Sequence, residues 1–94
     1  MVKHIVCFKL KDGESALKAK EVLLSMQGKV PTAKSISVNI DELKSARSFD
    51  IILEVLLDDF KALDEYQVDP YHCEVVKTHM HAVMEKSIAL DFTV

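Results

Sequence analysis

Apolar and polar residues alternate along several segments of the chain, which is the pattern of β-strands with one buried face. In the first segment, residues 2–10, five side chains share a face: Val2, His4, Val6, Phe8 and Leu10. Residues 35–40 alternate in the same way, whereas residues 49–57 are apolar on both faces and form the strongest predicted strand. In a fourth strand, residues 84–92, one side is expected to hold Met84, Ile88, Leu90 and Phe92.

Helical patterns separate these strands. Residues 14–27 are rich in helix formers, and Gly28 is expected to end that helix. The aspartate pair at 58–59 predicts the N-cap of a short helix, whose inward stripe is Phe60, Leu63 and Tyr66. Asp69 followed by Pro70 predicts the start of another helix, because a carboxylate caps the first turn and proline is favoured at its first position.

The resulting element order is β-α-β-β-α-β, with the second helix broken at residues 69–70. This order is typical of the ferredoxin-like fold, an α+β architecture in which one four-stranded antiparallel sheet carries both helices on one face. A chain of 94 residues is expected to form a single domain, here residues 1–94.

The face of the sheet without helices is also predicted to be apolar, since it would hold Ile5, Cys7, Ile52 and Leu56. Monomeric proteins rarely expose an apolar patch of this kind. We therefore expect a homodimer that pairs through the open sheet face, giving a dimeric α+β barrel. The alternative is that the tail of the broken second helix wraps round and covers part of the patch.

Composition narrows the partners and the compartment. Twelve Lys and Arg against fifteen Asp and Glu give a net charge of −3, which offers no footprint for nucleic acid. The apolar runs are far too short for a membrane span, and lysines within residues 2–11 exclude a signal peptide. Two cysteines are too few for a disulfide framework. A cytoplasmic protein with no membrane partner is expected.

Three residues are candidates for chemistry. His4 shares a face with apolar residues, so it is either a hydrogen-bonded core histidine or a functional group. Tyr66 is expected to face inward, and His72 lies in the first turn after Asp69, where the helix dipole disfavours its protonated form. A neutral imidazole beside a phenol is a usable acid/base pair. The carboxylate of Asp69 opposes the dipole, which leaves the direction of the shift in the pKa of His72 open.

Residues 2–11, Val-Lys-His-Ile-Val-Cys-Phe-Lys-Leu-Lys, resemble the first strand of the stress-responsive A/B barrel (Dabb) family. Residues 66–72 match that family's Tyr-x-x-x-Pro-x-His stretch, and residues 90–92 are similar to its last strand. The resemblance implies a dimeric α+β barrel. A plant member of the family cyclises a polyketide without a cofactor, and its catalytic residues would correspond to His4, Tyr66 and His72. The chain has Asp69 where the family often has His.

The remaining residues predict no metal site and no cofactor. His79 and His81 have metal-ligand composition near Cys73, but the segment is typical of a helix end or loop, where a solvated pair is expected. No glycine-rich phosphate loop is present. The residues expected to contact a ligand are Val6, Phe8, Phe60, Leu63 and Asp69.

Three functions remain compatible with the sequence. The first is a small Dabb protein that binds a small, partly apolar, oxygenated organic molecule between the sheet and the helices. The second is a cofactor-independent enzyme, polyketide-cyclase-like or lyase-like, that uses the histidine–tyrosine pair. The third is a structural, stress-associated assembly protein in which His4 and His72 are ordinary core groups.

Overall fold

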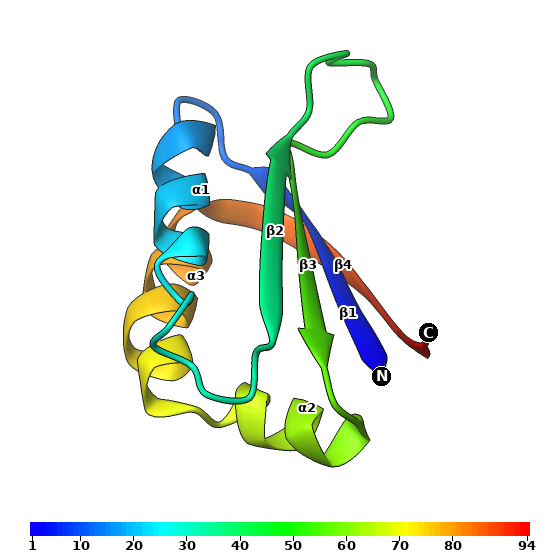
Figure 1. Ribbon diagram of the computed structural model, residues 1–94. Helices are drawn as coiled ribbons and strands as arrows, with labels where there is room; N and C mark the ends of the chain where they lie inside the picture. Colours follow the sequence, from blue (N-terminus) through cyan, green and yellow to red (C-terminus); the bar gives the residue numbers. More distant parts are fainter.

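The computed structural model describes residues 1–94 and contains one antiparallel sheet with the strand order β2-β3-β1-β4. The strands are β1 (Val2–Leu10), β2 (Ser35–Ile40), β3 (Ile51–Leu57) and β4 (Met84–Thr93). Each alternating segment of the sequence therefore becomes a strand, because alternation buries one face of each. Figure 1 shows the helices on one side of this sheet. The predicted ferredoxin-like βαββαβ fold is confirmed.

The helices follow their capping signals. In α1 (Ala16–Leu24) the Ser15 hydroxyl accepts a hydrogen bond from the Lys18 N–H, and in α2 (Phe60–Gln67) the Asp59 carboxylate accepts from the Ala62 N–H. The predicted first helix was too long, because the chain continues past Leu24 in tight turns to Gly28, whose φ is +81°. The last helical segment begins at residue 70 and comprises the π-helical turn η1 (His72–Lys77) and α3 (Thr78–Val83).

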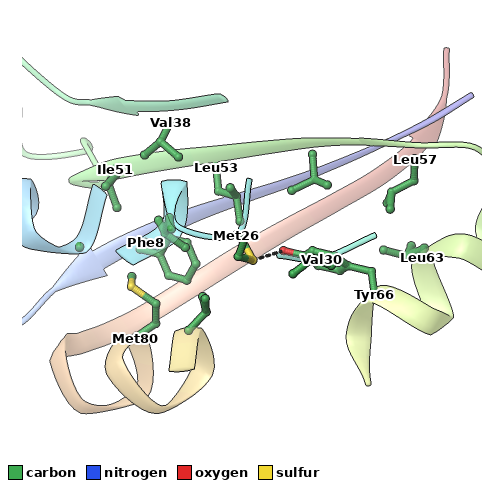
Figure 2. Close-up of a cluster of buried hydrophobic side chains, with 14 of the residues drawn as sticks. Phe8, Met26, Val30, Val38, Ile51, Leu53, Leu57, Leu63, Tyr66 and Met80 are labelled. Atoms are coloured by element: carbon green, nitrogen blue, oxygen red, sulfur yellow. Dashed lines mark hydrogen bonds between the residues drawn. The ribbon is translucent and has the colours of Figure 1, made fainter. Parts of the chain in front are cut away.

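The core lies between the helix-bearing face of the sheet, hereafter the covered face, and the helices (Figure 2). Leu53 and Leu57 from β3 pack there with Leu23 and Met26 of the α1 region, all essentially inaccessible to solvent. Burying one such side chain stabilises the fold by about 1.5–3 kcal/mol. One expected core residue is missing: Phe60, predicted on the inward stripe, is 50% exposed at the first position of α2.

The opposite face carries no helix, since α3 packs beside α1 on the covered face (Figure 1). The pairing register places Leu90 opposite Ile5, and Ile88 opposite Cys7. We call this surface the open sheet face and define it by Ile5, Cys7, Ile52, Leu56, Ile88, Leu90 and Phe92. The alternative to a dimer, in which a helix tail wraps round this face, is not what the structure shows.

Met84 was predicted on the same side as Ile88, and it lies on the other. The register between β1 and β4 shifts between Lys9 and Leu10, which pairs Leu10 with Met84. Because Leu10 faces the core, Met84 does too. A bulge of this kind adds one residue to a strand and reverses the side on which every residue beyond it lies.

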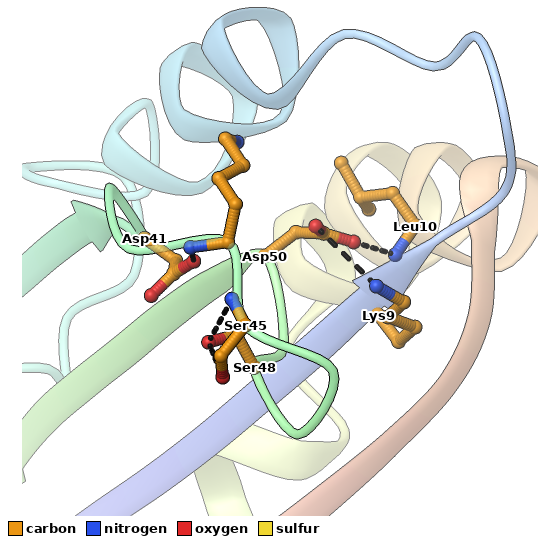
Figure 3. Close-up of polar contacts among 7 residues, drawn as sticks. Lys9, Leu10, Asp41, Ser45, Ser48 and Asp50 are labelled. Carbon is orange, nitrogen blue, oxygen red and sulfur yellow. Dashed lines mark hydrogen bonds and ion pairs between the residues drawn. The ribbon is translucent and has the colours of Figure 1, made fainter.

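The loop between β2 and β3 is attached to β1 through Asp50 (Figure 3). Its carboxylate accepts a hydrogen bond of 2.7 Å from the Leu10 N–H and lies 3.8 Å from the ammonium of Lys9. Within the loop, the Asp41 carboxylate accepts from the N–H of Lys44, which has a left-handed φ of +59°. These contacts fix the end of β1. No helix has the length and apolar character that a membrane crossing requires.

Candidate functional site

The covered face and the helices enclose a cavity of about 230 Å³. Its walls come from β1, β3 and β4 on one side and from α1, α2, η1 and α3 on the other. His4, Tyr66 and His72 all line it, together with Val6 and Phe8. The structure thus brings the three candidate residues for chemistry to one site.

His4 enters the cavity from β1 and is almost completely buried. The register places it directly opposite Asp91 on β4, and its ring Nδ1 donates a hydrogen bond of 2.5 Å to the Asp91 carboxylate. A carboxylate can only accept a hydrogen bond, so the hydrogen is on Nδ1. The other ring nitrogen, Nε2, takes no part in this bond. Asp91 therefore orients the imidazole, a partner that the sequence did not indicate.

Tyr66, at the end of α2, lies between the two imidazoles and is wholly buried. Its ring centroid is 5.6 Å from that of His4, edge to face, and 4.3 Å from that of His72, stacked. The hydroxyl donates to the Met26 sulfur at 3.6 Å (Figure 2). Burial, and secondly the charge of Asp69, raise the pKa of Tyr66 far above its ordinary value. The phenol therefore stays protonated near neutral pH and can donate a hydrogen bond.

His72 is held by the chain on either side of it. Its Nδ1 donates to the Tyr66 carbonyl oxygen at 3.0 Å, so the lone pair of the neutral ring is on Nε2. Burial lowers the pKa of His72, and the hydrogen bond to the Tyr66 carbonyl is the main influence that opposes this shift. The charges of Lys77 and His4 lower the pKa further, and Asp69 opposes them too weakly to reverse the direction. The Asp69 carboxylate is engaged by the N–H groups of Tyr71 and His72, at 2.9 and 3.1 Å. The direction that the sequence left open is therefore downward.

We expect the lowered pKa of His72 to make the fold less stable in mild acid. The unfolded chain, with an ordinary pKa of 6.5, binds the proton more tightly than the folded chain. The contribution is therefore absent above about pH 6.5 and grows as the pH falls toward the folded-state pKa, to at most about 1.4 kcal/mol at pH 5.5. Urea unfolding at pH 7.5 and 5.5 measures it. The variant His72→Gln should lose less stability between these pH values than the parent, and an equal loss would contradict the assignment.

The residues expected to contact a ligand divide into two groups. Val6 and Phe8 line the cavity, whereas Phe60, Leu63 and Asp69 do not. Phe60 is turned toward solvent, Leu63 is buried in the core, and Asp69 caps a helix. Sequence reasoning missed ten lining residues, which are Leu23, Leu53, Gln67, Val76, Lys77, Met80, His81, Met84, Ser87 and Ala89. Seven of them, from Val76 to Ala89, lie after the π-helical turn begins.

The second histidine pair also differs from expectation. His79 and His81 lie in α3, at the end of the last helical segment, where a solvated pair was expected, but only His81 is exposed. His79 has its Nε2 buried without a hydrogen-bond partner, and His81 lines the cavity. The chain contains no cluster of three or more potential metal ligands. The chemistry available in the cavity is therefore that of imidazole, phenol and one ammonium group: proton transfer and hydrogen bonding to an oxygenated molecule.

Solved structures share this fold. The crystal structure of the Arabidopsis thaliana protein At3g17210 matches with a TM-score of 0.84 and 22% identity, covering 100% of this chain and 95% of that one. A dimeric ferredoxin-like protein of unknown function from Bacteroides fragilis matches with 0.82 and 22%, covering 99% and 95%. The hydroxynitrile lyase of Passiflora edulis matches with 0.82 and 18%, covering 99% and 92%. At these identities the likeness concerns the fold alone.

No curated protein matches the sequence. A family model does: the one described as the stress responsive A/B barrel domain, Dabb, matches residues 2–94. The match spans every strand and helix described above, including the residues that line the cavity. The chain therefore belongs to the stress-responsive A/B barrel (Dabb) family.

Proposed function

We propose that this chain binds a small, partly apolar, oxygenated organic molecule in the cavity between the sheet and the helices. The observation that carries the proposal is the convergence of His4, Tyr66 and His72 on one cavity whose remaining lining is largely apolar. Ligand sites combine apolar walls with a few converging polar groups in this way. Both imidazoles have Nδ1 engaged by the protein, so each has Nε2 left for a ligand.

The functional unit in this proposal is a cytoplasmic homodimer that pairs through the open sheet face. Seven apolar or thiol side chains gather there, and Leu90 is 64% exposed. A patch of this size is unusual on a monomer and is self-complementary across a two-fold axis. The related Bacteroides fragilis protein is dimeric, which supports the same arrangement here. Cys7 and Cys73 are free thiols, in keeping with a reducing compartment.

The substitution Ala89→Phe is expected to abolish ligand binding with little loss of stability. Ala89 lies on β4, lines the cavity and is exposed, so a larger side chain would fill the opening without disturbing the core. In thermal-shift assays with aromatic and polyketide-like compounds, a ligand at about 100 times its Kd stabilises the parent by about 2.7 kcal/mol. The variant should show no such shift.

The matched control is Ala46→Phe, the same change in the exposed loop between β2 and β3. It should respond to ligand like the parent. A shift that persists in Ala89→Phe would place the ligand elsewhere. If no compound shifts the parent, the binding proposal fails, and a purely structural assembly protein becomes the better account.

A second candidate function is cofactor-independent acid/base catalysis, polyketide-cyclase-like or lyase-like. In this scheme His72 Nε2 takes a proton from a carbon next to a carbonyl, and the electron pair moves to the carbonyl oxygen as an enolate. The Tyr66 hydroxyl would donate a hydrogen bond to that oxygen, while His4, oriented by Asp91, would relay the proton.

One observation favours this candidate. The Tyr66 hydroxyl is wholly buried, yet its acceptor is a thioether, which is a weak one. A hydroxyl kept only for folding would be expected to have a stronger partner, whereas a substrate oxygen could replace sulfur at little cost. The scheme requires the hydroxyl to be dispensable for folding, which the substitution Tyr66→Phe tests. The fold also accommodates a hydroxynitrile lyase in Passiflora edulis.

A further inference from the structure

The cavity differs in charge from the rest of the molecule. The chain has a net charge of −3 and fifteen acidic residues, but none of them lines the cavity. Lys77 and His81 do line it. Two carboxylates contact lining polar residues, and both are occupied: that of Asp91 accepts from the His4 ring, and that of Asp69 accepts from the N–H groups of Tyr71 and His72. A ligand in the cavity therefore meets basic and neutral groups and no acidic ones.

Lys77 is positioned by the backbone and has no ionic partner. Its ammonium donates to the Gln67 carbonyl oxygen at 3.0 Å, and an ammonium has three hydrogens, so two remain for another acceptor. The three ion pairs of the protein involve His4, Lys9 and Lys34. Neither Lys77 nor His81 takes part in one.

The π-helical turn brings these two residues to the cavity. His81 lies nine positions after His72, about two and a half turns of an α-helix, which would place them on opposite faces. A π-turn contains about one residue more than an α-helical turn. The rotation about the helix axis from His72 to His81 is therefore only a little over two turns, which brings the two side chains closer to the same face. Lys77 likewise moves toward the side of His72. The π-helical turn thus places the ammonium of Lys77 and the imidazole of His81 at the same cavity as the buried His72.

Lys77 and His81 lie nearer the solvent than the three candidate residues for chemistry. His81 is exposed and Lys77 is half-buried, whereas His4, Tyr66 and His72 are buried. An anionic group would therefore be bound at the mouth, with the apolar part of the ligand directed inward along Val6 and Phe8. The single positive charge of Lys77 matches a ligand group with a single negative charge. The helical segment that begins at residue 70 is capped by the Asp69 carboxylate, which already accepts from the N–H groups of Tyr71 and His72, so these groups are not free for a phosphate.

We infer that the ligand is a small carboxylate with an apolar body, whose carboxylate binds Lys77 and His81 at the cavity mouth. This inference rests on the proposed binding function and adds the ligand class to it. The carboxylate would accept hydrogen bonds from the two N–H groups of the Lys77 ammonium that Gln67 leaves free. The same placement would hold the body of the ligand, and any second oxygen on it, beside the imidazoles.

The test compares phenylacetate with its neutral counterpart, phenylacetamide, by NMR titration of the ¹⁵N-labelled protein at pH 7. We expect phenylacetate to bind at least tenfold more tightly and to shift the amide signals of Lys77 and His81. The variant Lys77→Met should reduce that preference to less than twofold. Lys77→Arg, which keeps the cation, should retain it. The control Lys18→Met removes an exposed lysine of α1 and should also retain it.

Each contrary result has its own meaning. Equal affinity for the acid and the amide, or a preference that Lys77→Met leaves intact, would overturn the carboxylate inference while leaving the binding function in place. Tighter binding of phenyl phosphate than of phenylacetate would assign the mouth to phosphate instead and would also overturn it. If neither probe shifts any cavity residue, the inference fails, and the proposed binding function loses its support as well. The ¹H–¹⁵N spectrum of each variant reports whether it is folded.

Discussion

The substitution Leu90→Asp is expected to yield a monomer at micromolar concentrations at which we expect the parent chain to be a dimer. Leu90 lies on the open sheet face, in the edge strand β4, opposite Ile5 and between Ile88 and Phe92 on the same side of that strand. A dimer that pairs through this face would bury the aspartate twice, once in each copy. At about 2 kcal/mol for each unpaired polar group, dissociation would be favoured by about 4 kcal/mol, or roughly 10³-fold in Kd.

Size-exclusion chromatography with light scattering measures the change directly. The control is Leu43→Asp, because Leu43 is 81% exposed in the loop between β2 and β3 and does not belong to the open sheet face. It should leave the dimer intact. A monomeric parent, or a Leu90→Asp variant that still dimerises with its parent affinity, would show that a second copy does not cover this face.

Most of the fold was predictable because its signals are local. Alternation in residues 2–10 and 35–40 places the strands correctly, since burying one face of a sheet requires a period of two. The caps at Asp59 and Asp69 were also predictable, because the carboxylates satisfy N–H groups that lie only two or three residues further on. Phe60 was misplaced because a residue at the first position of a helix need not continue the buried stripe.

The errors arise where a single residue changes the period. The bulge at Lys9 and Leu10 reverses the side on which Met84 lies, and the π-turn moves Lys77 and His81 to the cavity. Both irregularities depend on hydrogen bonds between distant or non-standard partners. Neither alters the apolar periodicity enough to be recognised in a single sequence.

The candidate site was predictable in part for the same reason. His4 sits in a regular stretch of β1, and Tyr66 and His72 follow capping signals, so their convergence could be expected from the fold. The pairing of His4 with Asp91 depends on the register between β1 and β4, which forms across 87 residues of sequence. The stacking of the His72 ring on the Tyr66 ring depends on side-chain packing that periodicity does not encode.

Replacing Tyr66 by Ala is expected to lower the free energy of unfolding by about 3–5 kcal/mol, the range for truncating a large buried aromatic side chain. Tyr66 is wholly buried and contacts both imidazoles through its ring. Tyr66→Phe keeps the ring and removes only the bond to the Met26 sulfur, so it should change stability by less than about 1 kcal/mol. Urea unfolding at pH 7.5 and one fixed protein concentration measures both.

Met26→Leu is the matched control, because it removes the acceptor and leaves the hydroxyl of Tyr66 in place. A buried hydroxyl without a partner should cost about 1–3 kcal/mol, more than the loss of the hydroxyl itself. If the Tyr66 hydroxyl serves to donate to a ligand oxygen, Tyr66→Phe should therefore destabilise the fold less than Met26→Leu does. If Tyr66→Phe instead loses about 2 kcal/mol or more, the hydroxyl is a structural group, and the acid/base scheme lacks its donor to the enolate oxygen.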